Sequence, residues 1–156
     1  MNEFIKKFGK ESRWVAWKLV NKDGKPTKIP FTVDGKMASS ADPTTWSSYN
    51  DIIKRHSGIG IVFTPDKTLL GIDIDHCLND KEEIDHAEKA DIETFIAQSN
   101  TYTEVSPSKK GLHIFLIVTH PVDLTAHKHA PYEVYSSGRY FTFTGRTWKG
   151  DKYNIE

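Results

Sequence analysis

The sequence predicts an α+β domain built mainly from antiparallel strands, with few helices. Short runs rich in strand-forming residues alternate with turn residues along most of the chain. Only two stretches predict helices, and no internal repeat or low-complexity linker divides the sequence. A chain of 156 residues is near the common size of one domain, so we expect a single unit over residues 1–156.

A strand and a turn near the N-terminus predict the first hairpin. Residues 13–19 are rich in strand formers, and residues 21–24 (Asn-Lys-Asp-Gly) supply a turn that returns the chain antiparallel. Lysines of this hairpin, such as Lys25 and Lys28, could bind an anionic partner. A solvated charged loop explains them equally well.

The segment from Asp42 predicts the first helix. Asp42 can cap the backbone donors of a helix, and Pro43 suits its first position, where the missing N–H costs nothing. We expect this helix to run to about His56. Trp46 and Tyr49 would then share one helical face and fill the core beneath it.

Strands make up most of the remaining chain. We expect one strand at residues 59–63 and another at residues 69–75, joined by a turn at residues 64–67. Between residues 81 and 99, apolar residues recur on roughly one helical face, which predicts a surface helix covering a sheet. Four short strands are then expected, at residues 102–105, 112–118, 132–135 and 139–143.

Composition narrows the function classes. No apolar run approaches the length needed to cross a bilayer, and residues 1–10 lack the apolar core of a secretory signal, so we expect a cytoplasmic protein without a membrane role. The lone Cys77 allows no internal disulfide. The 21 Lys and Arg residues balance the 21 Asp and Glu residues, so the chain lacks the overall basic excess of many nucleic-acid binders. Acidic metal ligands and local basic residues can cancel in such a sum.

The sharpest local motif is a pair of aspartates at the end of an apolar strand. Asp73 and Asp75 are two residues apart, so strand geometry places both on one face while Ile72 and Ile74 point into the core. Two close carboxylates repel unless a cation lies between them, and Mg²⁺ prefers such oxygens together with water and phosphate. Taken alone, a strand end whose acids simply meet water is as good a reading.

A polar loop at residues 106–113 (Ser-Pro-Ser-Lys-Lys-Gly-Leu-His) predicts an anion site. Gly111 allows backbone N–H groups to approach a phosphate closely, and Ser108 and Lys110 add a hydroxyl and an ammonium group. His113 opens the following strand, where its imidazole can donate to a phosphate oxygen. In isolation, a polar hairpin with a structural histidine is the simpler interpretation.

A hairpin turning at residues 137–138 adds a third candidate carboxylate and a cation. Glu133 lies on its first strand and Arg139 near the start of its second. Glu133 could be a metal ligand, and the planar guanidinium of Arg139 suits phosphate. Taken alone, the two could instead form an exposed cross-strand ion pair of little energetic value.

These three motifs, in this order and spacing, resemble the primase-polymerase domains of phages, plasmids and genomic islands in the archaeo-eukaryotic primase superfamily. Further similar elements are Trp14-x-x-Trp17, residues 28–31 (Lys-Ile-Pro-Phe) and Asp42-Pro43-x-x-Trp46. The resemblance therefore covers most of the chain. Lys109 stands where the family often carries a glycine, and a lysine narrows the backbone conformations open to the turn.

The resemblance implies a fold and a set of residue roles. Two packed modules would carry the active site in the cleft between them, one module resembling an RNA-recognition motif. The activity implied is that of a nucleotidyltransferase which extends a 3′-hydroxyl on a single-stranded DNA template with dNTPs or NTPs. Two divalent ions, Mg²⁺ or Mn²⁺, are implied as cofactors. The implied ligands of the metals are Asp73, Asp75 and Glu133, and those of the nucleotide phosphates are Ser108, Lys110, His113 and Arg139.

Two other functions fit the same residues. A metal-dependent nuclease also uses two or three acids with a nearby histidine and lysine, and a non-catalytic module of a replication initiator could keep only the nucleotide or single-strand grip. Residues 144–156 contain no obvious terminating helix, so we expect the chain to be the N-terminal part of a longer replication protein with a fused or associated helicase. A stand-alone protein with fraying last residues is the alternative.

Overall fold

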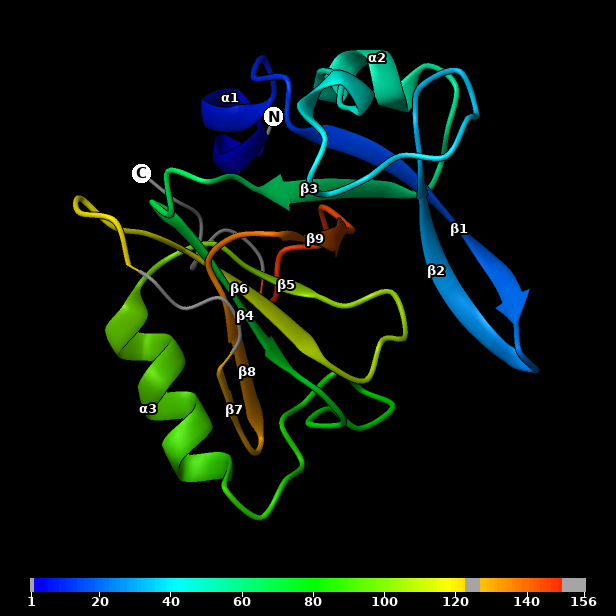
Figure 1. Cartoon of the computed structure of the whole chain (residues 1–156). Coiled ribbons are helices and arrows are strands. Elements are labelled where there is room, and N and C mark those ends of the chain that lie inside the picture. Colours follow the sequence, from blue (N-terminus) through cyan, green and yellow to red (C-terminus); the bar gives the residue numbers. More distant parts are fainter. Residues whose placement is uncertain (1, 123–126, 150–156) are drawn as a thin grey trace.

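The computed structural model describes residues 2–122 and 127–149 (Figure 1). Its helices and strands are, in chain order, α1 (Glu3–Phe8), β1 (Trp14–Lys22), β2 (Lys25–Phe31), the 3₁₀ helix η1 (Pro43–Thr45), α2 (Tyr49–Ile53), β3 (Ile59–Phe63), β4 (Leu69–Ile74), α3 (Lys89–Ser99), β5 (Thr103–Val105), β6 (Leu112–Ile117), β7 (His127–His129), β8 (Tyr132–Tyr135) and β9 (Arg139–Phe143). In this part of the chain, no helix is both long and apolar enough to span a bilayer.

Within the described residues, the strands form two antiparallel sheets. The four-stranded sheet has the order β2-β1-β3-β9, and the five-stranded sheet has the order β5-β6-β4-β8-β7. The predicted α+β class with mainly antiparallel strands and few helices is confirmed. The likeness of one module to an RNA-recognition motif stays a prediction.

The chain crosses from one sheet to the other between β3 and β4 and again between β8 and β9. β3 pairs with β9 in the first sheet, and β4 pairs with β8 in the second, so the two crossings lie side by side. At this junction the backbone N–H of Gly138 donates to the carbonyl oxygen of Phe63 at 3.3 Å. Residues just before and after the second crossing therefore lie between the two sheets.

Alternate residues of the five-stranded sheet face different environments. Ile72 and Ile74 of β4 are buried against Ile92 and Ile96 of α3, which covers this face of the sheet. The intervening residue, Asp73, therefore projects from the opposite face. This is the alternation that the apolar run before the aspartates predicted.

The main core is a cluster of aromatic side chains contributed by both sheets, α1 and α2. Phe4 of α1 is fully buried, and its ring centroid lies 4.9 Å from that of Phe115 and 5.2 Å from that of Tyr102. Neither α1 nor the short strand β7 was predicted from the sequence. A helix of six residues is too short to show a periodic pattern, and its position depends on the burial of Phe4 and Phe8.

The first hairpin is confirmed, including its turn. β1 pairs with β2 out to Lys22 opposite Lys25. Asp23 and Gly24, with φ angles of 52° and 79°, both adopt the left-handed conformation that a two-residue hairpin turn of this kind requires. The Asp-Gly pair was therefore a reliable signal.

The single helix expected from Asp42 to about His56 is wrong. The chain forms η1 and α2 instead, and Trp46 between them is extended. Ser47 and Trp14 exchange two backbone hydrogen bonds of 2.8 and 2.9 Å, a pairing that a continuous helix would prevent. Trp46 packs in a small cluster with Val15 and Val62, so it does not share a helical face with Tyr49.

The second expected helix is shorter than residues 81–99, because α3 begins only at Lys89. The preceding residues form turns in which the Asn79 side-chain oxygen accepts from the backbone N–H groups of Lys81 and Glu83 at 2.9 and 3.0 Å. Leu78 also forms a bridge with Ile84. These local bonds satisfy backbone donors that a helix would otherwise use.

We expect Gly71→Ala to lower the free energy of unfolding by about 1–3 kcal/mol, because overpacking a filled core forces neighbours to move. A Cβ atom at this position would lie 2.2 Å from Cζ of Phe63 and 2.7 Å from a ring carbon of Phe141. Urea unfolding measures the change. Leucine at position 63 lacks the clashing Cζ atom, so the double variant with Phe63→Leu should lose less than the sum of the single losses. Strict additivity would contradict this packing.

Candidate functional site

Five ionisable side chains form one row across the five-stranded sheet, one from each strand. The strand register places Glu104 opposite His113, His113 opposite Asp73, Asp73 opposite Glu133, and Glu133 opposite Lys128. Directly opposite residues of an antiparallel pair project from the same face, so the row lies on the face that α3 does not cover. We call these five side chains the charged row.

Charges of opposite sign are neighbours along most of the charged row. Nδ1 of His113 lies 3.4 Å from Oε1 of Glu104, and its Nε2 lies 3.7 Å from Oδ1 of Asp73. At the other end, Nζ of Lys128 lies 3.7 Å from Oε1 of Glu133. Within this row, Asp73 and Glu133 are the neighbours of like charge, so a cation between them would be favoured.

Glu104 anchors the buried end of the row. Its side chain is fully buried, and its oxygens accept from the Tyr102 hydroxyl at 2.8 Å, from the Thr144 N–H at 3.0 and 3.1 Å, and from the Gly145 N–H at 3.0 Å. Burial and the neighbouring Glu104 raise the pKa of Tyr102, so this hydroxyl stays a donor. Glu104 therefore fixes His113 and also ties the segment after β9 to the sheet.

His113 is held between two carboxylates. Burial by itself lowers the pKa of its imidazole, but the hydrogen bond and charge of Glu104, together with the charge of Asp73, raise the pKa above its ordinary value. The protonated ring can then donate from Nδ1 to Glu104 and from Nε2 toward the site. The ring tilts over Phe141 at a centroid distance of 5.0 Å, which limits its rotation.

Asp73 is the least satisfied member of the charged row. Burial raises the pKa of its carboxyl to about 6, with the charges of Asp75 and Glu133 adding to the rise and that of His113 opposing it. Among the described residues, no hydrogen-bond donor reaches its buried Oδ1 atom. An oxygen that is buried without a donor suggests a partner that the protein itself does not supply.

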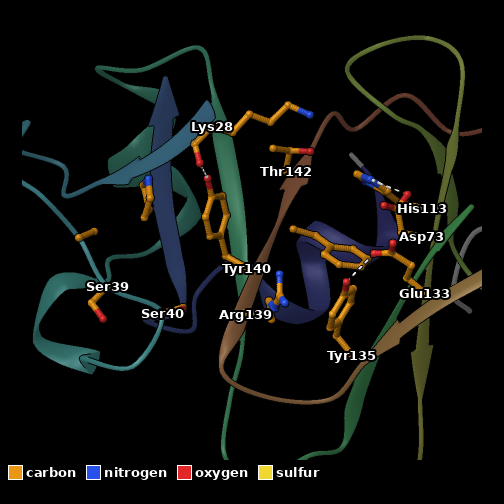
Figure 2. A pocket seen from close by; sticks show the side chains of 13 residues that line it. Lys28, Ser39, Ser40, Asp73, His113, Glu133, Tyr135, Arg139, Tyr140 and Thr142 are labelled. Atoms are coloured by element: carbon orange, nitrogen blue, oxygen red, sulfur yellow. Dashed lines mark hydrogen bonds and ion pairs between the residues drawn. The ribbon is translucent and has the colours of Figure 1, made fainter. Parts of the chain in front are cut away.

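The charged row forms one wall of a pocket of about 560 Å³ (Figure 2). Asp73, His113 and Glu133 line it from the five-stranded sheet, and Lys28 and Tyr140 line it from the four-stranded sheet. The other lining residues are Pro30, Ala38, Ser39, Ser40, Tyr135, Arg139, Phe141 and Thr142. The pocket therefore lies where the two sheets meet.

Arg139 enters the pocket at the second crossing between the sheets. Its guanidinium carbon lies 4.7 Å from the ring centroid of Tyr135, and the Tyr135 hydroxyl donates to Glu133 at 2.5 Å. Burial and the bond to Glu133 raise the pKa of Tyr135 to about 12. The tyrosine thus connects a carboxylate and a guanidinium, and it holds the cation beside the acids.

The structure brings together Asp73, Glu133, His113 and Arg139 of the seven residues predicted from the sequence. β4 ends at Ile74, so Asp75 is exposed just beyond the strand and does not line the pocket. It lies beside the turn at residues 106–111, since a Cβ atom on Gly111 would be 3.5 Å from Cα of Asp75.

Ser108 and Lys110 also lie on that turn. Neither residue lines the pocket. The Ser108 hydroxyl is 3.0 Å from that of Ser106 and accepts from the Lys110 N–H at 3.2 Å. Nζ of Lys110 lies 3.6 Å from a carboxylate oxygen of Asp80. Lys109 has a φ of 65°, a conformation that favours glycine.

Sequence reasoning missed Glu104 and Tyr135. A charged residue between two β-branched residues of a short strand was the available signal for Glu104, because such a residue must find partners when the strand is buried. No comparable signal distinguishes Tyr135 from any other strand aromatic.

The pocket residues fit a hard divalent cation. Among the described residues, no three histidine, cysteine or acidic side chains converge as a preformed metal site. Mg²⁺ commonly uses only one or two carboxylates and takes its other ligands from phosphate and water. The unsatisfied Oδ1 of Asp73 beside Glu133 suits that mode of binding.

The chain is similar to a known protein over most of its length. The chain is 34% identical over 157 residues to a DNA primase-polymerase of Nitratiruptor phage NrS-1. The match covers 94% of this chain but 21% of the phage protein, so the chain spans about a fifth of the length of that relative. No family model matches the sequence.

We expect Glu104→Ala to lower the free energy of unfolding by about 3–5 kcal/mol, because it leaves buried donors and the His113 imidazolium without an acceptor. Guanidinium chloride unfolding measures the loss. Glu93→Ala is the matched control, since Glu93 is exposed on α3 and its ion pair with the exposed Lys89 is worth no more than about 1 kcal/mol. Equal losses in the two variants would contradict the anchoring role of Glu104.

Proposed function

Because the chain is similar over 94% of its length to a phage DNA primase-polymerase, we propose that it is a primase-polymerase domain of the archaeo-eukaryotic primase superfamily. It would transfer nucleotides from dNTPs or NTPs to a 3′-hydroxyl on a single-stranded DNA template. The observation that carries this proposal is the pocket in which adjacent carboxylates, Asp73 and Glu133, lie beside the cations His113 and Arg139. A metal-bound triphosphate presents the complementary charges.

The acids of the site would hold the divalent ions, Mg²⁺ or Mn²⁺. Asp73 and Glu133 face one another in the strand register, and Asp75 lies on the adjacent turn, close enough for its charge to raise the pKa of Asp73. When bound, such ions neutralise phosphate charge and lower the pKa of an attacking hydroxyl. Asp75 is proposed as a ligand on the motif and on this proximity.

The cations of the pocket would bind the triphosphate. The guanidinium of Arg139 can donate two parallel hydrogen bonds to phosphate oxygens, and Nε2 of His113 can donate a third. Both side chains are preoriented, Arg139 on the Tyr135 ring and His113 by Glu104, so little side-chain entropy is lost on binding. Ser108 and Lys110 on the neighbouring turn remain proposed as further phosphate contacts.

The reaction would be a displacement at the α-phosphate. The 3′-oxygen forms a bond to the α-phosphorus while the bond to the bridging oxygen of pyrophosphate breaks. Arg139 and His113 would stabilise the negative charge that develops on the leaving group. The fused or associated helicase expected from the resemblance stays a prediction.

We expect Asp73→Asn to reduce nucleotide transfer by on the order of 100-fold or more, because the site loses a carboxylate charge that would hold a divalent ion at the reacting phosphates. A labelled-primer extension assay with dNTPs and a divalent ion measures this loss. The fold should survive, since the variant removes a poorly solvated charge. Asp34→Asn is the matched control, because Asp34 is exposed in an ion pair with Arg55 outside the pocket.

Near-normal extension by Asp73→Asn would overturn the proposed function. The same assay separates the competing activities. A nuclease shortens the labelled strand without triphosphates, and a non-catalytic module leaves its length unchanged.

We expect Mn²⁺ to raise the melting temperature of the wild-type chain, because an ion that binds only the folded state stabilises it by about 2.7 kcal/mol at 100 times its Kd. The double variant Asp73→Asn, Glu133→Gln should show no such rise in a thermal-shift experiment with Mn²⁺ alone. A rise of equal size in both proteins would place the ion elsewhere.

A further inference from the structure

The hairpin of β1 and β2 projects beyond the rest of the four-stranded sheet (Figure 1). β1 pairs with β3 only from Trp14 to Ala16, whereas it pairs with β2 as far as Lys22. Residues 18–26 are all exposed. This two-stranded projection is longer than the packing of the sheet requires, so its surface is available to a partner.

The projection carries a strong positive charge in a chain with no net charge. Residues 18–28 contain four lysines and one acid, Asp23, which gives a local charge of +3. Such an excess attracts a polyanion and would repel a basic partner. The lysines are Lys18, Lys22, Lys25 and Lys28, and the strand register places Lys28 on one face of the hairpin and the other three on the opposite face.

The register shows which side chains share the face that leads to the pocket. Trp17 is opposite Pro30, Leu19 is opposite Lys28, and Asn21 is opposite Pro26. Lys28 and Pro30 also line the pocket beside Asp73. We call the surface formed by these six side chains the hairpin face; it starts at the pocket and runs outward to the turn.

The hairpin face combines apolar surface with a cation. Leu19 is 62% exposed, and Trp17 is half-buried with its indole N–H fixed to the carbonyl oxygen of Ile59 at 3.0 Å. Nζ of Lys28 lies 5.7 Å from the Trp17 ring centroid. Exposed apolar surface beside an ammonium group matches a strand of unpaired bases and phosphates.

We propose that the hairpin face binds single-stranded DNA and leads it to the pocket, with bases against Trp17 and Leu19. Phosphates would lie on Lys28 and, around the edge of the hairpin beside its turn, on Lys22 and Lys25. This inference rests on the proposed function, since it assigns the template path to a surface beside the same site. A basic surface without apolar groups would fit duplex phosphates equally well, and the exposed leucine favours unpaired bases.

Fluorescence anisotropy with a labelled oligothymidylate tests the charges. Lys22→Gln with Lys25→Gln changes two exposed residues beside the turn and should weaken DNA binding about 10-fold at low salt. Each lost phosphate contact also lowers the slope of log Kd against log salt by about 0.7, so the slope should fall by about 1.4. Lys7→Gln with Lys10→Gln is the control, because it removes equal charge from exposed positions on and after α1.

Leu19→Ser tests the apolar contact separately. Its removal should weaken binding severalfold and leave the salt slope unchanged, since no phosphate contact is lost. The inference would be overturned if the hairpin and control lysine substitutions weakened DNA binding equally. It would also be overturned if the hairpin bound duplex DNA or RNA more tightly than single-stranded DNA. Primer extension by the wild-type chain distinguishes the two proposals. If the wild-type chain extends primers normally but the hairpin variants bind DNA as tightly as the wild-type chain, only the inference about the hairpin face is rejected.

Discussion

The geometry of the site depends on the buried carboxylate of Glu104. A charge in the protein interior is tolerated only when donors surround it, and Glu104 recruits its donors from Tyr102, His113 and the segment after β9. These contacts fix the first member of the charged row, and opposite charges then alternate along it as far as Asp73. The row breaks this alternation between Asp73 and Glu133, where the sheet presents repelling carboxylates to the pocket.

The two walls of the pocket come from different sheets, and the aromatic core joins them. Phe141 contributes to the pocket lining and also contacts Phe63 in the core at a centroid distance of 4.8 Å. Gly71, one pleat from Asp73 on the same face, has no room for a methyl group against the same rings. Core packing therefore sets the distance between the acids on the five-stranded sheet and the cations Lys28 and Arg139 on the four-stranded sheet. A substitution in the core would change that distance.

Most strands of the two sheets and part of the site could be predicted from the sequence, because their signals are local. The apolar run before Asp73 and the Asp-Gly turn of the first hairpin are local signals, and the structure follows both. The pairing of Ser47 with Trp14 is not local, and it replaced an otherwise well-capped helix with extended chain. Glu104 was missed because its partners, Thr144 and Gly145, lie about 40 residues away. The position of Asp75 depends on the end of β4 at Ile74, and those of Ser108 and Lys110 depend on the turn between β5 and β6.

The double crossing between the sheets has a consequence for synthesis of the chain. β3 pairs with β9, so Ile59 cannot form this pairing until its partner Phe143 has been synthesised. Pairing over such a sequence separation forms slowly. A nascent chain that has emerged only as far as β6 already carries Asp73 and His113 but lacks Glu133 and Arg139. The pocket therefore assembles only after β8 and β9 have emerged and paired with β4 and β3.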